Sequence, residues 1–358
     1  MCLSIRERVI AFAKLGKQLG LAANALKANR EIITRGTTRN LLEEATNALK
    51  ENPWFTQESV CLSISSISQM LKRDNLEKWL SAYPRISKIS GKGKKIIGVV
   101  MAGNLPLVGF HDFLCVLISG HSFTGKLSSK DSKLPVAVAE MLLEIEPRFK
   151  DKISFSIELP PRCHAVIATG SDNSARYFEH AYGNKPNLFR KNRTSVAILT
   201  GQETSQELEL LANDIFRYFG LGCRNVSKLY VPKGYDLNSL KGHWERYSNL
   251  TSHQGYNNNI IYNKALMNVG RVPFIDFEFC TLKYGFDLMS AISVINVEEF
   301  DTIDQCMKGV LAQQEKLQCI VANIRSDDFR VIRFGESQRP QLWDYADGVD
   351  TIRFLMKQ

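Results

Sequence analysis

Cys223 stands where a helical pattern gives way to a strand pattern, at a place suited to a reactive thiol. It follows two glycines in the segment FGLGCRNVSKLYV (219–231). Gly220 and Gly222 leave the backbone free to approach a ligand, and the neighbouring Arg224 favours the thiolate form of the cysteine. A thiolate in a loop can attack a carbonyl carbon and hold the acyl group as a thioester. The alternative is packing, because most free cysteines are small buried residues.

The elements that must position this loop alternate between strands and helices. The run IIGVVMA (96–102) is apolar and rich in β-branched residues, as expected of a strand buried on both faces. Pro106 stands at the predicted first position of a helix that ends near Gly120. HSFTGK (121–126) and HAVIATGS (164–171) are further strand patterns, and a helical pattern follows each. This alternation predicts a parallel sheet of the doubly wound type.

Two helical regions flank these strands. Residues 1 to about 90 are predicted to be mostly helical, because their apolar residues recur at helical spacing. After a further strand pattern, Thr204 and Glu207 have the spacing of a capping box. The helix that they begin is predicted to run to Phe219 and to stop at the next glycine. Cys223 is therefore expected on the connection from this helix to the next strand.

The composition excludes several classes of protein. A chain of 358 residues, 44% hydrophobic and 23% charged, is long enough for two globular domains. No segment approaches the ~18 unbroken apolar residues of a membrane span, and the N-terminal segment MCLSIRERVIAFAKLGKQLG is predicted to be an amphipathic helix instead of a signal peptide. The eight cysteines lack metal-ligand spacing, so we expect no metal site and a reducing, cytoplasmic location. The net charge of +9 indicates a polyanionic partner, either nucleic acid or a phosphorylated cofactor.

Four motifs occur in an order found in aldehyde dehydrogenases. They are AGNLPL (102–107), SGHSFTGKLSSKD (119–131), ATGSDNSAR (168–176) and GLGCRNVS (220–227). From about residue 90 to 320 the sequence resembles the aldehyde dehydrogenase superfamily, and within it the LuxC-like acyl-CoA reductases. The resemblance implies an α/β fold with two doubly wound parallel-sheet domains, a helical N-terminal region, and a homo-oligomer. It implies a helical region with a Rossmann-like cofactor domain (1–200), a catalytic domain (201–325) and a C-terminal segment (326–358).

The resemblance also implies roles for single residues. Cys223 matches the nucleophile, and Asn104 matches the asparagine whose amide holds the developing oxyanion, a contact worth roughly 3 kcal/mol. From the residues alone, Asn104 could equally be a turn residue that caps the next helix. Lys126 matches the lysine near the adenine ribose of the cofactor. Gly170 and Ser171 match the turn that opens a helix beneath the pyrophosphate.

The sequence departs from the superfamily pattern at two places. The segment PNLFRKNRTSVAIL (186–199) has no carboxylate, although hydrolytic members carry a general-base glutamate there. This absence argues against release of a free acid. Asp287, in KYGFDLMSAIS, falls near the position of the glutamate that holds the cofactor ribose, so a degenerate member without redox activity stays open. Lys130 adds positive charge that favours NADPH over NADH, and the basic run RKNR (190–193) could meet cofactor phosphates or lie in an exposed loop.

Together these features predict an enzyme that uses NADPH, or NADH, to reduce an acyl-CoA to an aldehyde through a cysteine acyl-enzyme. The acyl group could instead arrive on another carrier or from an acyl-transferring partner protein. A cysteine-dependent acyltransferase is the first alternative, and nicotinamide binding would separate the two. A basic nucleic-acid-binding protein has the least support, because aromatic and basic residues do not interleave as in single-strand binders.

Overall fold

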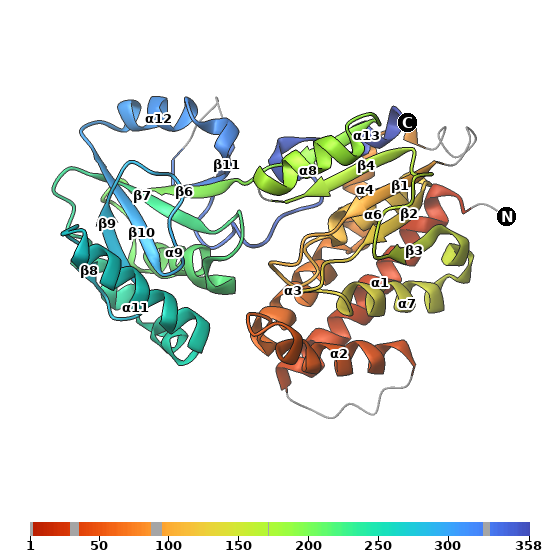
Figure 1. Cartoon of the computed structure of the whole chain (residues 1–358), viewed down its shortest axis with the longest axis horizontal. Helices are drawn as coiled ribbons and strands as arrows, with labels where there is room; N and C mark the ends of the chain where they lie inside the picture. The colour runs from red at the N-terminus through yellow and green to blue at the C-terminus, as the bar shows by residue number, and fades with distance from the viewer. Residues whose placement is uncertain (1–2, 29–35, 87–94, 171, 325–329) are drawn as a thin grey trace. The chain divides into compact units, whose positions relative to one another are not determined.

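The computed structural model describes residues 3–28, 36–86, 95–170, 172–324 and 330–358. The chain packs as two compact units, which Figure 1 colours by residue number. Unit 1 comprises Met1–Lys191 together with Pro340–Gln358, and unit 2 comprises Asn192–Arg339. Unit 2 is therefore an insertion within the sequence of unit 1. The predicted functional limits at residues 200 and 325 stay a prediction.

The first part of unit 1 is helical, as its apolar spacing predicts. Its helices are α1 (Ile5–Ala28), α2 (Thr37–Glu51), α3 (Gln57–Met70) and α4 (Arg73–Ser81). α1 packs closely on the α3 region, because Gly16 faces Leu71 and a Cβ at that glycine would lie 2.6 Å from Leu71 Cβ. The small residue thus sets how near the two helices approach.

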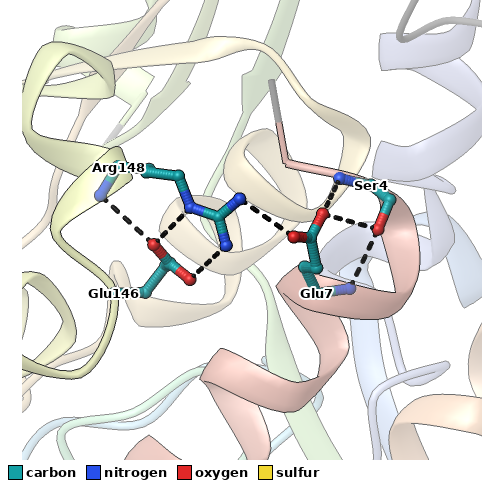
Figure 2. Close-up of polar contacts among 4 residues, drawn as sticks. All are labelled: Ser4, Glu7, Glu146 and Arg148. Carbon is teal, nitrogen blue, oxygen red and sulfur yellow. Dashed lines mark hydrogen bonds and ion pairs between the residues drawn. The ribbon is translucent and has the colours of Figure 1, made fainter. Parts of the chain in front are cut away.

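A capping box and an ion pair fix the start of α1 (Figure 2). The Ser4 N–H donates to Glu7 Oε2 (2.7 Å), and the Glu7 N–H donates to Ser4 Oγ (3.3 Å). Arg148 Nη1 lies 2.9 Å from Glu7 Oε1, and the same guanidinium contacts Glu146. The Ser4 N–H, more than any other group, lowers the pKa of Glu7 to about 2. The first helix is thereby tied to the segment around residue 148.

Within the described residues, a five-stranded parallel sheet forms the centre of unit 1. Its order is β3–β2–β1–β4–β5, and every neighbouring pair is parallel. The strands are β1 (Ile96–Val100), β2 (Ser122–Lys126), β3 (Ile153–Ser156), β4 (Ala165–Thr169) and β5 (Asn187–Arg190), and the helices between them are α6 (Phe110–Ser119), α7 (Leu134–Ile145) and α8 (Asp172–Tyr182). From β1 the chain builds the sheet first to one side and then to the other, which is the predicted doubly wound arrangement.

The helix after Asn104 begins later than predicted. Residues 106–109 form a turn, and α6 begins at Phe110. Placing Pro106 at the first helical position was wrong, because Leu107 has a left-handed φ of 58° that no helix accommodates. The other end of α6 agrees with the prediction, since Gly120 is its left-handed C-cap with φ 94°.

The C-terminal segment completes unit 1. Its helix α13 (Thr351–Met356) packs against α6. The Tyr83 hydroxyl donates to Asp350 Oδ2 (2.8 Å), and a His121 ring nitrogen lies 3.1 Å from the Leu355 carbonyl oxygen. These contacts join residues 350–356 to the segment after α4, to α6 and to the start of β2.

Unit 2 is built, within the described residues, on a seven-stranded sheet of order β12–β11–β6–β7–β10–β9–β8. Neighbouring strands are parallel, except that β8 is antiparallel to β9. The strands are β6 (Thr194–Ile198), β7 (Val226–Pro232), β8 (Ile275–Asp276), β9 (Thr281–Tyr284), β10 (Val294–Phe300), β11 (Leu317–Val321) and β12 (Val331–Ile332), and the helices are α9 (Ser205–Phe216), α10 (Leu240–Trp244), α11 (Gln254–Val269) and α12 (Ile303–Leu311). The predicted capping box is confirmed, because the Thr204 side chain and the Glu207 side chain each accept the other's backbone N–H.

Candidate active site

Three of the predicted site residues lie at one edge of the unit 1 sheet. Val100 at the end of β1 is in register with Lys126 at the end of β2 and, on its other side, neighbours Ala168 of β4. Asn104 follows β1 and Gly170 follows β4, so both belong to the carboxyl edge that Lys126 also occupies. The strand order reverses direction between β1 and β4, and ligands of doubly wound sheets bind at such a point.

Asn104 is exposed on a loop that the rest of unit 1 holds firmly. The buried Asp131 carboxylate accepts the Leu107 N–H at 2.7 Å, and Ser63 Oγ donates to the Pro106 carbonyl at 2.6 Å. A Cβ at Gly103 would lie 2.4 Å from Ser128 Oγ, so the loop passes close to the segment after β2. These contacts fix the backbone that carries the Asn104 amide.

Lys126 and Gly170 are set by their contacts with α8 and its surroundings. Lys126 is half-buried at the end of β2, with Nζ 5.9 Å above the Tyr177 ring of α8. A Cβ at Gly170 would lie 2.6 Å from Ser174 Cβ, so only glycine permits this approach of β4 to the first turn of α8. Ser171, the other residue predicted for this turn, lies outside the described residues.

Cys223 differs from the other thiols of the described chain in being exposed. It lies in the turn between α9 and β7. Burial raises the pKa of the Cys115 and Cys280 thiols well above their ordinary value and that of Cys306 to about 12. Those cysteines stay protonated and covered at neutral pH, whereas Cys223 is accessible to a ligand. The exposure favours the reactive interpretation of this residue.

Asn225, two positions after the cysteine, holds the Cys223 turn. Its buried side chain accepts the Gly222 N–H (2.9 Å) and donates to the carbonyl of Arg217 (2.8 Å) and to two carbonyls at the end of α9. Ser195 Oγ donates to the Cys223 carbonyl at 2.9 Å. The backbone of the turn is thus bonded on both sides of the cysteine.

α9 ends three residues before the predicted Phe219. The helix stops at Phe216, and Tyr218 and Phe219 have left-handed φ values of 53° and 59° before Gly220 at 75°. Such a backbone conformation is strained for residues other than glycine. It is compensated by the Asn225 bonds and by the Phe219 ring, which packs on His253 with centroids 4.5 Å apart. The prediction failed because the apolar spacing continues through residues whose backbone leaves the helix.

Asp287 belongs to unit 2, as Cys223 does, and its side chain is exposed on the segment after β9. The structure therefore groups the predicted residues by unit, with Asn104, Lys126 and Gly170 in unit 1 and Cys223 and Asp287 in unit 2. The joint action of Asn104 and Cys223 on one substrate stays a prediction.

Comparison with known families shows to which family the chain belongs. A family model described as acyl-CoA reductase (LuxC) matches residues 21–242, which is more than half of the chain. The chain belongs to the LuxC acyl-CoA reductase family. The resemblance that the four motifs indicated is therefore confirmed. A search of curated proteins gave no match.

Solved structures similar to this LuxC-family chain include aldehyde dehydrogenases of low sequence identity. The P. syringae indole-3-acetaldehyde dehydrogenase, in complex with NAD+, is 14% identical, with a TM-score of 0.58 over 89% of this chain and 76% of its own. Aldehyde dehydrogenase 21 from Physcomitrella patens is 12% identical, with a TM-score of 0.62 over 99% of this chain and 88% of its own. An NADP-dependent enzyme of E. coli is 11% identical, with a TM-score of 0.60 and coverages of 90% and 78%. The predicted aldehyde dehydrogenase-like fold is confirmed, and family and fold together indicate an oxidoreductase of this type.

The LuxC-family chain uses part of its basic run for packing. Arg190 is buried and forms a two-pronged ion pair with Asp112, while Nη2 also donates to Thr351 Oγ1 at 2.9 Å. Both interpretations of the run, as a phosphate contact and as an exposed loop, are therefore wrong for Arg190. Its charge instead joins α6 to the C-terminal helix.

Several residues that build the site were missed by sequence reasoning. Asp131 and Asn225 gave no signal, because single polar residues in loops are common. Lys228 and Asn296 did carry a signal, since each stands inside an apolar strand pattern, KLYV and VINV. A polar residue in the middle of a buried strand needs a partner inside the protein, and both have one, as described below.

The described residues contain no group of three or more His, Cys, Asp or Glu side chains that could hold a metal ion. None of their helices combines the length and the apolar character that crossing a bilayer requires.

Proposed function

We propose that this LuxC-family protein reduces an acyl thioester to an aldehyde while the acyl group is held on Cys223. The observation that carries the proposal is the exposed Cys223 thiol on a turn that Asn225 and Ser195 hold in place. A thiol that is accessible and held in a fixed position can attack a carbonyl carbon along a defined direction. The absence of a carboxylate from residues 186–199 supports transfer from a thioester over hydrolysis.

The proposed reaction has two stages. In the first, Cys223 Sγ attacks the carbonyl carbon of the acyl-CoA, the bond to the coenzyme A sulfur breaks, and coenzyme A leaves as the thiol after taking up a proton. The Cys223 N–H and the Asn104 amide, assigned by its AGNLPL motif, donate to the carbonyl oxygen as it gains negative charge. In the second stage, reduction of the acyl group and cleavage of its bond to Cys223 Sγ release the aldehyde and restore the thiolate.

The carboxyl edge of the unit 1 sheet has the chemistry that a dinucleotide requires. α8 begins just beyond Gly170, and the N-terminus of a helix attracts phosphate. Lys126 would hold the adenine ribose, and the exposed Lys130 adds charge that favours NADPH over NADH. Asp287 would hold a ribose of the cofactor. A bound nicotinamide supplies the two electrons and the hydrogen that the second stage needs.

Three further parts of the proposal concern the acyl donor, the location and the assembly of the protein. Acyl-CoA is the proposed donor, although another carrier or an acyl-transferring partner protein would serve the same thiol. The seven cysteines in the described residues are all free, which agrees with a reducing, cytoplasmic location. A homo-oligomer is proposed from the family resemblance.

Intact-mass measurement tests the proposal. The wild type, Cys223→Ala and, as a matched control, Cys61→Ala are each incubated with a panel of acyl-CoAs, before and after addition of NADPH. We expect one acyl group on the wild type and on Cys61→Ala, none on Cys223→Ala, and discharge as aldehyde when NADPH is added. An adduct that neither NADPH nor NADH discharges would identify an acyltransferase instead. An adduct on Cys223→Ala would contradict the assignment of the nucleophile.

A further inference from the structure

The segment 286–289, which carries Asp287, is bonded to the sheet of unit 2 through all four of its backbone carbonyls. The donors are side chains of β7 and β10, not backbone groups. They are Lys228 Nζ to the Phe286 carbonyl (2.8 Å), Asn296 Nδ2 to the Asp287 carbonyl (2.9 Å) and the Met289 carbonyl (3.0 Å), and Ser227 Oγ to the Leu288 carbonyl (2.6 Å). Lys228 and Asn296 are direct partners in the pairing of β7 with β10. The segment therefore crosses these two strands.

Two of these donors, Lys228 and Asn296, lie at buried positions where a polar side chain lowers the stability of the fold. The Lys228 side chain is completely buried. Its ammonium also contacts Glu298 and lies 4.8 Å from the Tyr230 ring centroid. The Asn296 amide uses its N–H groups on two carbonyls, and its buried Oδ1 finds no hydrogen-bond partner in the described part of the chain. Burying a charge and leaving a polar atom unpaired both lower stability. Both residues nevertheless do the same thing, which is to hold backbone carbonyls of segment 286–289.

The third donor is aimed by an irregularity in the sheet. Ser195 pairs with Val226 and Val196 with Lys228, so Ser227 is the extra residue of a β-bulge in β7. A bulge redirects a side chain, and here the hydroxyl reaches the Leu288 carbonyl. Ser195, the residue opposite the bulge, donates to the Cys223 carbonyl. The supports of segment 286–289 and of the cysteine turn therefore meet at the start of β7.

Three of the four side chains of the segment are exposed. Phe286 is 84% exposed, Met289 is 55% exposed, and Asp287 is also exposed. Leu288 alone points inward, where it packs with Tyr230 and its neighbours. The carbonyls are thus bonded to the sheet while a carboxylate is displayed between two apolar side chains.

We propose that Ser227, Lys228 and Asn296 are positioning residues that hold segment 286–289 across β10 and β7, so that Asp287 is fixed for the ribose hydroxyls of the cofactor. This inference rests on the proposed function, because it takes Asp287 as the ribose-binding group. The three side chains act on the cofactor only through the backbone of the segment. They are therefore expected to affect cofactor binding and to leave acyl transfer to Cys223 nearly unchanged.

The test compares full-length variants by two readouts. Binding of NADPH is titrated by fluorescence without acyl substrate, and formation of the acyl adduct is followed by intact mass. We expect Ser227→Ala and Asn296→Ala to weaken NADPH binding about tenfold and to form the adduct at a rate within about threefold of wild type. Hydrogen exchange of a peptide spanning 284–290 is expected to accelerate in both variants. The segment should open more often once its carbonyls lose their donors, and opening exposes its backbone N–H groups to exchange. Ser227→Ala removes a single oxygen and decides the test if Asn296→Ala does not fold.

The matched control is Asn263→Ala. The Asn263 amide is also buried and donates to a backbone carbonyl, that of Ile292 at 2.9 Å, beyond the segment. We expect wild-type NADPH binding from this variant, and an equal loss there would overturn the inference. Asp287→Ala combined with Asn296→Ala should bind NADPH no more weakly than Asp287→Ala alone, since a positioning residue has no effect without its target. Additive losses, or unchanged binding in Asn296→Ala, would also overturn it. A wild type that binds neither NADPH nor NADH would instead refute the proposed function itself.

Discussion

Asp131 places a carboxyl group where its charge is unfavourable. Burial, aided by the nearby Glu51, raises its pKa from 3.8 to about 7, although the Leu107 N–H acts in the opposite direction. Lys130, Lys133 and Glu44 line the same small cavity. Between pH 3.8 and about 7 the folded state binds more protons at Asp131 than the unfolded state. The free energy of unfolding of unit 1 is therefore expected to fall as pH rises through this window.

Asp131→Asn is expected to remove this pH dependence. The amide keeps an acceptor for the Leu107 N–H and presents an N–H₂ group where Asp131 Oδ1 finds no partner in the described residues. The gain in stability at pH 8 should be at most about 4 kcal/mol, because one pKa unit corresponds to about 1.4 kcal/mol. Urea unfolding at pH 5 and pH 8 measures it, with the exposed Asp151→Asn as control. Equal pH slopes in wild type and Asp131→Asn would refute the expectation.

Replacing Asn225 separates the geometry of the Cys223 turn from the stability of the fold. Asn225→Ala leaves the Gly222 N–H and three carbonyls without their partner, which should lower stability by about 2–3 kcal/mol. We expect acylation by acyl-CoA to slow at least tenfold, because the turn no longer fixes the Cys223 thiol and N–H. Alkylation by iodoacetamide, which needs no such donor, should change much less. The control is Asn213→Ala, whose buried side chain on α9 contacts Arg246 and Tyr247 instead of the turn. Comparable slowing of acylation in that variant would mean that lost stability, and not lost geometry, is responsible.

At the scale of elements, the junction of β4 with α8 leaves no room for a side chain. Gly170→Ala would place a Cβ 2.6 Å from Ser174 Cβ and 3.0 Å from the Phe178 ring. The helix start must shift, so we expect NADPH binding to weaken at least tenfold in a fluorescence titration. Adding Ser174→Gly removes the nearer clash and should restore part of the affinity. If the double variant binds no better than Gly170→Ala, displacement of the helix is not the cause.

Sequence patterns predict the elements of this chain better than the contacts between them. Apolar patterns predicted β1, β2, β4, β6 and β7 and the helices that follow β1, β2 and β4, but they did not predict β3, β5 or β8–β12. The capping box at Thr204 was confirmed. Periodicity did not reveal that Tyr218 and Phe219 turn left-handed, because that strain is compensated by Asn225 from the following turn. Nor could it show that Arg190 meets Asp112, since that pair depends on how β5 and α6 pack. Contacts between distant residues depend on tertiary structure, and a local pattern does not contain them.

At the scale of the whole molecule, the C-terminal segment is expected to stabilise one unit only. Removal of residues 340–358 takes away the Thr351 partner of Arg190 and the Tyr345 hydroxyl that accepts the Trp79 indole N–H at 2.7 Å. It also uncovers the α6 surface on which α13 packs. We expect hydrogen exchange in β1 and β2 to accelerate at least tenfold, while β7 and β10 change little. A chain that lacks only residues 357–358 is the control, and equal acceleration in both units would disagree with this division.

The insertion of unit 2 within the sequence of unit 1 has a consequence for synthesis on the ribosome. The 148 residues of unit 2, 192–339, are translated before the segment that completes unit 1. At about 5–20 residues per second, this delay lasts roughly 7–30 seconds. During that time the ion pair of Arg190 and Asp112 lacks its covering helix. At its end unit 2 is fully translated, whereas unit 1 still lacks residues 340–358. The unit encoded second is therefore expected to finish folding first, and chaperones that protect the nascent chain should act mainly on unit 1.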